Sequence, residues 1–219
     1  MVENKLIYTI CTKNGTLSVI SRGNMLALRN DNVGYSCIYT DQSEYQPILT
    51  EVQELIDSFH KGHSLEKALI LGGGCCTIPR FMIKRFGNSV YIDSVEYVSE
   101  IIEITKRYFL TGIATDKLNI VNIDAFRFIN ETKTKYNVIF VDLFNGGKIV
   151  ENVISESFIK NIHKHMESDA IAIVNTFQCS TIERNEIRKL GLKYFDHCFC
   201  KLDDFGTDYI VLVNGDFKA

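Results

Sequence analysis

The sequence lacks an excess of positive charge, a long apolar run and a regular pattern of cysteines. It has 24 lysines and arginines against 27 aspartates and glutamates and a pI near 6.0, so no nucleic-acid surface is predicted. No apolar run approaches the length of a membrane span, and the first residues lack the core of a signal peptide. Seven cysteines without framework spacing indicate a reducing compartment. We therefore expect a cytoplasmic protein with no nucleic-acid and no membrane partner.

A metal site is not predicted. The segment His197–Cys200 carries three side chains of metal-binding type. On a strand, however, Cys198 and Cys200 share one face and His197 points to the other, so the three do not converge. We interpret these cysteines as small core residues.

Three consecutive glycines form the most informative turn of the sequence. Leu69–Leu71 is a short apolar run without polar alternation, which predicts a parallel strand buried on both faces. Gly72–Gly74 follow it, and the apolar spacing over Ile78–Phe86 predicts a helix with one face on the sheet. A glycine turn at a helix N-terminus is where α/β folds hold a nucleotide. The Gly-x-Gly-x-x-Gly spacing of dinucleotide binders is not met, because Thr77 stands in its last position.

An acidic residue ends the next predicted strand. Glu96 closes Ser89–Glu96 and lies about twenty residues beyond the glycines, where a carboxylate accepts both ribose hydroxyls. A lone acid at a strand end is commonly just solvated. With the glycine turn before it, the ribose interpretation is favoured.

Two styles of sequence meet near residue 41. Residues 1–42 hold short apolar segments with turn signals such as Asn14-Gly15, which predict a small N-terminal β domain with an antiparallel sheet. Residues 43–219 alternate predicted helices and strands, beginning with a helix over 47–59. This alternation predicts a doubly wound parallel sheet.

Two further strands, over 193–201 and 209–214, are joined by an Asp-Asp-Phe-Gly turn at the end of the chain. The predicted class is therefore α/β: a Rossmann-like, doubly wound, mostly parallel seven-stranded sheet with an antiparallel C-terminal hairpin, preceded by the small β domain. Such a hairpin is typical of class I methyltransferase-like folds rather than of nicotinamide dehydrogenases.

Two more acids follow predicted strands. Asp124 and Ala125 come after Leu118–Ile123 and are placed to meet an adenine amino group, although Asp124 equally suits a cap of the next helix. Asp142 ends Tyr136–Asp142 and precedes a Leu-Phe-Asn-Gly-Gly loop, which it could also simply cap. Ligands of open α/β sheets bind outside the carboxyl ends of the strands. An adenosine-type ligand accounts for all of these strand ends together.

This ordered series of motifs resembles the spermidine synthase (polyamine aminopropyltransferase) family. The resemblance rests on Leu-Gly-Gly-Gly, Val-Glu, Ile-Asp-Ala and the strand that ends in Asp142, and it extends to Glu-Tyr-Gln at 44–46 and Ser-Glu-Ser-Phe at 155–158. For the donor, the resemblance implies that Gly72, Gly73 and Gly74 pass close to the nucleoside sulfonium, that Glu96 holds the ribose, and that Asp124 with Ala125 meets the adenine.

For the acceptor, the resemblance implies that Asp142 is the base or anchor for the attacking amine. It also implies a gate between donor and acceptor, lined by Tyr45 as a catalytic or substrate-binding group and by Gln46 as a donor-binding group.

Two positions depart from the family pattern. Cys75 stands where the family has an aspartate after the glycines, and Asn145 stands where it has a second aspartate in the catalytic loop. In the family these carboxylates receive cationic amines. An aspartate would repel the carboxylate that S-adenosylmethionine carries and its decarboxylated form lacks. Cys75 carries no negative charge, so this repulsion is absent and we expect S-adenosylmethionine as the donor. We expect Cys75 to lie at this donor and Asn145 to lie at the substrate.

Three functional interpretations remain open. The first is transfer of a methyl or aminocarboxypropyl group from S-adenosylmethionine to a small amine-type acceptor, with Asp142 as base or anchor. The second is aminopropyl transfer from decarboxylated S-adenosylmethionine to a diamine. The third is a non-catalytic nucleoside-binding relative. The donor is a co-substrate, no metal is expected, and the resemblance implies a homodimer through the N-terminal β segment.

Overall fold

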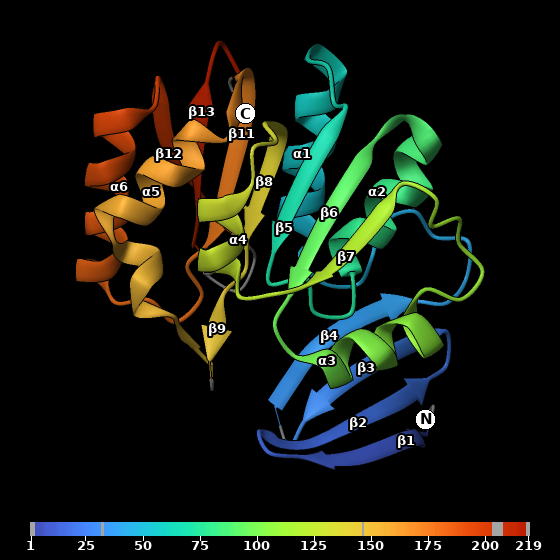
Figure 1. The fold of residues 1–219 in the computed structure, drawn as a ribbon. Helices are drawn as coiled ribbons and strands as arrows, with labels where there is room; N and C mark the ends of the chain where they lie inside the picture. Colours follow the sequence, from blue (N-terminus) through green and yellow to red (C-terminus); the bar gives the residue numbers. More distant parts are fainter. Residues whose placement is uncertain (1–2, 32, 146, 203–207, 218–219) are drawn as a thin grey trace.

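A seven-stranded sheet forms the centre of the computed structural model, which describes residues 3–31, 33–145, 147–202 and 208–217. The strand order is β12-β13-β11-β8-β5-β6-β7 (Figure 1). Strands β5 to β8 and β11 pair in parallel, and β13 is antiparallel to both β11 and β12. The bounds are β5 (Lys67–Leu71), β6 (Tyr91–Glu96), β7 (Leu118–Asn122), β8 (Tyr136–Val141), β11 (Met166–Asn175), β12 (His197–Leu202) and β13 (Asp208–Asn214). The predicted mostly parallel sheet with an antiparallel C-terminal hairpin is confirmed.

Helices bury both faces of this sheet, as its continuous apolar strands require. In β5, Ala68 and Ile70 belong to one apolar cluster, whereas Leu69 and Leu71 belong to the other. The first cluster includes helices α1 (Thr50–Gly62) and α2 (Thr77–Phe86), and the second includes α4 (Ala125–Glu131), α5 (Glu156–Lys164) and α6 (Thr181–Tyr194). With both faces covered, the carboxyl ends of the strands are the place left for a ligand.

An antiparallel sheet precedes the main one, as predicted. Its strands pair in the order β1 (Lys5–Thr12), β2 (Gly15–Arg22), β3 (Met25–Asn30) and β4 (Val33–Tyr39). Leu17 and Leu28 of this sheet share an apolar cluster with Ile101 of helix α3 (Ser99–Ile104) and with Phe109 of the π-helical turn η2 (Thr105–Phe109). Because this cluster draws on both parts of the chain, the division into domains 1–42 and 43–219 stays a prediction.

The last strand of the N-terminal sheet is fastened to the start of α2. The hydroxyls of Ser36 and Thr77 lie 2.9 Å apart, and the Thr77 hydroxyl donates to the carbonyl of Cys37 at 3.1 Å. Figure 1 shows the N-terminal sheet beyond the carboxyl ends of β5, β6 and β7. It therefore forms one wall of the space next to these strand ends.

Two predicted boundaries differ from the structure. The predicted strand over 193–201 begins only at His197, because α6 continues through Lys193 and Tyr194, whose side chains both donate to Glu156 of α5. The predicted helix over 47–59 begins at Thr50, because Leu49 adopts a left-handed conformation with φ 58°. The predicted Asp-Asp-Phe-Gly turn lies outside the described residues.

Short elements connect these parts. They are the single turns η1 (Gly87–Ser89) and η3 (Glu151–Ile154) and the two-residue strands β9 (Phe144–Asn145) and β10 (Lys148–Ile149), which pair with each other.

Within the described ranges, no helix has both the length and the apolar character needed to cross a membrane.

Candidate functional site

The glycine turn after β5 is packed too closely to accept other residues. Gly72 has φ +87°, and a Cβ there would lie 2.1 Å from the backbone oxygen of Asp142. A Cβ on Gly73 would lie 2.2 Å from the hydroxyl oxygen of Ser94. Both glycines donate their N–H to the carbonyl of Val95. The turn therefore lies directly between the carboxyl ends of β6 and β8, and only glycine permits this approach.

Glu96 connects this turn to the end of β6. Its side chain is 5% exposed, and its two carboxylate oxygens accept the N–H groups of Gly74 at 3.0 Å and Val98 at 2.9 Å. Burial raises the pKa of this carboxyl, whereas the backbone hydrogen bonds oppose the shift. Each carboxylate oxygen can accept a further hydrogen bond, so Glu96 is able to receive the two hydroxyls of a ribose.

Asp142 follows β8 on the other side of the turn. The Asn175 amide donates to its Oδ1 at 2.8 Å. Burial raises the pKa of Asp142 to about 6; the Asn175 hydrogen bond opposes this shift, and the charge of Glu96 adds to it. A carboxyl with this pKa is ionised at neutral pH and close to the range in which a general base works well.

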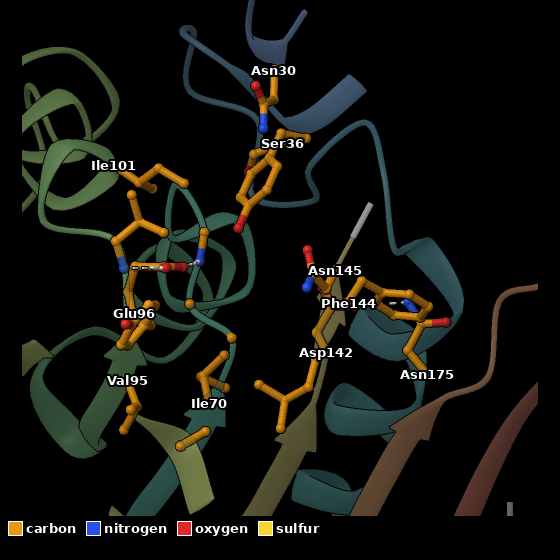
Figure 2. Close-up of a pocket in the computed structure, with 18 of the residues that line it drawn as sticks. Asn30, Ser36, Ile70, Val95, Glu96, Ile101, Asp142, Phe144, Asn145 and Asn175 are labelled. Atoms are coloured by element: carbon orange, nitrogen blue, oxygen red, sulfur yellow. Dashed lines mark hydrogen bonds between the residues drawn. The ribbon is translucent and has the colours of Figure 1, made fainter. Parts of the chain in front are cut away.

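These residues line one cavity of about 860 Å³, which is within the usual size range of small-molecule sites. Figure 2 shows Glu96 on one side and Asp142, Asn145 and Asn175 on the other, with Asn30 of the N-terminal sheet above them. Among the described residues, the lining contains no lysine, arginine or histidine and four acids, Asp31, Glu96, Asp124 and Asp142. The site therefore favours cationic ligands over anionic ones.

The predicted adenine contacts lie at the same cavity. Asp124 caps α4 by accepting the N–H of Arg127 at 2.9 Å, so its structural role is shown, and it lines the cavity together with Ala125 and Phe126. Asn145, the predicted substrate contact, is exposed at the end of β9 and lines the cavity too. The structure thus brings together Gly72, Gly73, Gly74, Glu96, Asp124, Ala125, Asp142 and Asn145.

Tyr45 and Gln46 are described, but they are not among the residues that line the cavity. Gln46 is 1% exposed, its side-chain oxygen accepts the N–H of Tyr39, and its amide donates to two backbone carbonyls. The Tyr45 ring packs on Phe81 with centroids 5.2 Å apart. In this arrangement Gln46 holds the chain before α1 and Tyr45 packs against α2, and the role of both residues at a gate stays a prediction.

Cys75 is likewise not among the residues that line the cavity. Its side chain is fully buried in the apolar cluster beneath the N-terminal sheet, and burial raises its pKa well above the usual thiol value. Burial likewise raises the pKa of Cys76 to about 12. Both thiols are therefore neutral at physiological pH, and the place of Cys75 at the donor stays a prediction.

Two functional candidates were not found from the sequence. Asn175 ends β11 and binds Asp142, so it belongs to the same group of polar strand ends and could have been found by that signal. Tyr35 lines the cavity from β4, and no local pattern marks it.

Among all the described residues, no group of three or more His, Cys, Asp or Glu side chains is arranged so that it could hold a metal ion.

The fold and this cavity define an α/β protein with an acidic cavity at the carboxyl ends of its parallel strands. The spermine/spermidine synthase domain matches residues 44–203, and the chain belongs to this family. Polyamine aminopropyltransferases of Methanocaldococcus jannaschii and Vibrio vulnificus are 29% identical over 108 residues and 24% identical over 154 residues. These matches cover 48% and 69% of this chain, but only 36% and 51% of the two relatives. The chain therefore spans about half the length of these relatives, or less.

Solved structures share the fold. A probable spermidine synthase from Corynebacterium glutamicum superposes with a TM-score of 0.83 at 16% identity, covering 98% of this chain and 81% of that one. A spermidine synthase in complex with the transition-state analogue AdoDATO gives 0.71 at 16% identity, over 96% of this chain and 72% of that one. Human methyltransferase-like protein 13 in complex with SAH gives 0.64 at 16% identity, over 75% and 82%. At these identities the likeness establishes the fold, including its relation to methyltransferases.

Asp142→Asn is expected to stabilise the folded protein at neutral pH. The pKa of Asp142 is about 6 against an ordinary value of 3.8, so between these values the folded chain holds a proton that the unfolded chain has released. The free energy of unfolding therefore falls as pH rises through this window and stays lower above it. A neutral asparagine removes this cost, so the variant should gain roughly 1–3 kcal/mol near pH 7.5.

Urea denaturation of both proteins near pH 4 and near pH 7.5 measures this difference. The gain should be confined to the higher pH, because both proteins are uncharged at this position when the carboxyl is protonated. Asp124→Asn is the matched control, since asparagine caps a helix as well as aspartate does. An equal gain at both pH values would contradict the buried charge at Asp142.

Glu96→Gln is expected to weaken the binding of adenosine by about tenfold or more. The glutamine amide cannot accept both backbone N–H groups that the carboxylate accepts, so the glycine turn and the ribose contacts are lost together. Isothermal titration calorimetry with adenosine measures the effect. Wild-type affinity in the variant would remove Glu96 from the nucleoside site.

Proposed function

We propose that this chain transfers an aminopropyl group from decarboxylated S-adenosylmethionine to a small amine. The observation that carries the proposal is Asp142 opposite Glu96 in one cavity, whose described lining has four acids and no basic side chain. Both co-substrates of such a transfer are cations. The family and its named polyamine aminopropyltransferase relatives support the same reaction.

The donor is assigned on charge. The sequence favours S-adenosylmethionine as donor because Cys75 replaces the aspartate of the family. The Cys75 side chain, however, packs in the apolar cluster and is not among the residues that line the cavity. The carboxylate of S-adenosylmethionine would enter among Glu96, Asp124 and Asp142 with no basic partner in the described lining. A charge without a partner costs free energy when it is desolvated. The decarboxylated donor offers an ammonium instead, so it suits this cavity better.

The reaction requires alignment and the removal of one proton. The amine nitrogen attacks the carbon next to the sulfonium, the carbon–sulfur bond breaks, and its electron pair stays on sulfur as a neutral thioether. Asp142 takes the proton that the amine loses, which its pKa of about 6 allows. The Asn175 amide holds Oδ1 of Asp142, so one oxygen is oriented by the protein and the other is available to the acceptor.

The acceptor is proposed only as a small amine-type molecule at Asp142 and Asn145. Asn145 offers an amide where the family has a second acid, so it binds an ammonium by hydrogen bonding rather than by charge. Methyl or aminocarboxypropyl transfer from S-adenosylmethionine and non-catalytic nucleoside binding are the competing outcomes of the test below.

Decarboxylated S-adenosylmethionine is expected to bind about tenfold tighter than S-adenosylmethionine. Calorimetric titration of the purified protein with each donor measures this preference. With the decarboxylated donor and a panel of aliphatic diamines, mass spectrometry should detect the aminopropylated amine and 5′-methylthioadenosine in equal amounts. Tighter binding of S-adenosylmethionine would restore methyl or aminocarboxypropyl transfer, and binding of neither would leave the non-catalytic interpretation.

We also propose a homodimer through the N-terminal sheet. Strand β1 is an edge strand, and its Leu6 and Ile7 are 59% and 40% exposed. Exposed edges with apolar side chains readily pair with another chain. Sedimentation equilibrium is expected to give twice the chain mass, and Leu6→Lys together with Ile7→Lys should give the monomer. A monomeric wild-type protein would refute the dimer.

A further inference from the structure

Tyr35 presents its ring to the cavity directly over the glycine turn. A Cβ built on Gly74 would lie 3.6 Å from Cε1 and 3.9 Å from Cδ1 of Tyr35, which is ordinary van der Waals contact. Under the proposed function, Gly74 is where the sulfonium end of the donor lies. An aromatic ring at this place can meet a cation with its electron-rich face, as in cation–aromatic recognition.

The strand that carries Tyr35 is fixed in place by the next two residues. Ser36 lies at hydrogen-bond distance from the Thr77 hydroxyl, and Thr77 donates to the carbonyl of Cys37. Thr77 is the first residue of α2, and only Cys75 and Cys76 separate it from the glycine turn. Tyr35 is therefore positioned by the same helix end that positions the glycines.

The hydroxyl of Tyr35 lies in the field of two acids that face each other across the cavity. Tyr35 as a whole residue is 40% exposed, but desolvation of its hydroxyl is the first cause that raises its pKa, and the negative charges of Glu96 and Asp142 come next. The phenol is therefore neutral at the pH at which Asp142 is ionised. Within the described part of the chain, no hydrogen bond to the Tyr35 hydroxyl is formed, so the hydroxyl is free to bind a ligand.

Tyr45, the tyrosine that the family resemblance points to, is placed differently. Its ring lies on Phe81, and the acid that raises its pKa most is Asp57, after the effect of burial. Asp57 belongs to α1 and pairs with Arg85 at 2.7 Å, away from the residues that line the cavity. The two tyrosines thus differ in the one property that matters for the reaction, which is access to Asp142.

We propose that Tyr35, and not Tyr45, orients the reacting groups: its ring packs on the sulfonium end of the donor, and its hydroxyl accepts a hydrogen bond from the attacking amine opposite Asp142. This inference rests on the proposed function. In the step itself, nitrogen forms a bond to the carbon next to sulfur, the carbon–sulfur electron pair moves to sulfur, and the amine proton goes to Asp142. Tyr35 neither gains nor loses a proton.

Three variants separate the ring from the hydroxyl and Tyr35 from Tyr45. Tyr35→Phe removes only the hydroxyl, and its kcat should fall about 10- to 100-fold with the KM for the donor within about twofold. Tyr45→Phe is the matched control, and its kcat should stay within about twofold of the wild type. Tyr35→Leu removes the ring as well, and it should weaken binding of the cationic donor about tenfold.

A neutral ligand distinguishes recognition from packing. The neutral thioether 5′-methylthioadenosine should bind Tyr35→Leu with nearly wild-type affinity, because the ring contributes through the positive charge. Calorimetry with both ligands gives the comparison, and thermal melts show whether each variant is folded. Equal losses for the cation and the neutral ligand, or equal kcat losses in Tyr35→Phe and Tyr45→Phe, would overturn the assignment.

The two proposals fail separately. If the wild type binds the donor but transfers nothing to any amine, the transferase proposal is refuted, and the binding comparison in Tyr35→Leu still decides the role of the ring. If the wild type transfers the aminopropyl group and Tyr35→Phe does so at the same rate, the reaction stands and the role of the Tyr35 hydroxyl is refuted.

Discussion

The whole site depends on the carboxylate of Glu96. It accepts the N–H groups of Gly74 and Val98 and so joins the glycine turn after β5 to the chain after β6. Gly72 lies against the carbonyl of Asp142 on the opposite side, so three neighbouring strand ends are held in one arrangement. Burial disfavours the charge on Glu96, but two backbone donors that would otherwise lack partners offset that cost.

Unbalanced negative charge is the second constraint on this site. Burial and then the charge of Glu96 raise the pKa of Asp142, and burial and then both acids raise the pKa of Tyr35. Among the described residues that line the cavity, none supplies a compensating positive charge. This concentration of negative charge is electrostatically unfavourable at neutral pH, and a cationic ligand offsets it. The charge on Asp142 lowers the free energy of unfolding of the ligand-free protein. A sulfonium or an ammonium that offsets this charge therefore gains binding free energy, which connects the stability cost at Asp142 with the proposed chemistry.

Much of the fold follows from local patterns, because those patterns depend on neighbours in the sequence. The apolar run before Gly72 and the acids at 96 and 142 mark strand ends in any parallel sheet. The burial of Cys75 has no such local cause, since it depends on packing against the N-terminal sheet. The same holds for Lys193 and Tyr194, which complete α6 because Glu156 of another helix accepts their side-chain hydrogen bonds.

By itself, the sequence determined the class of fold and the order of the polar strand ends, because each depends on residues within a few positions of one another. Only the tertiary structure decided which side chains meet in the cavity. Asn175 comes from β11 and Tyr35 from the N-terminal sheet, while Tyr45, which belongs to the Glu-Tyr-Gln segment that resembles the family, packs on Phe81. These contacts join segments far apart in the chain, and the direction of a side chain there is set by packing between elements rather than by its local sequence.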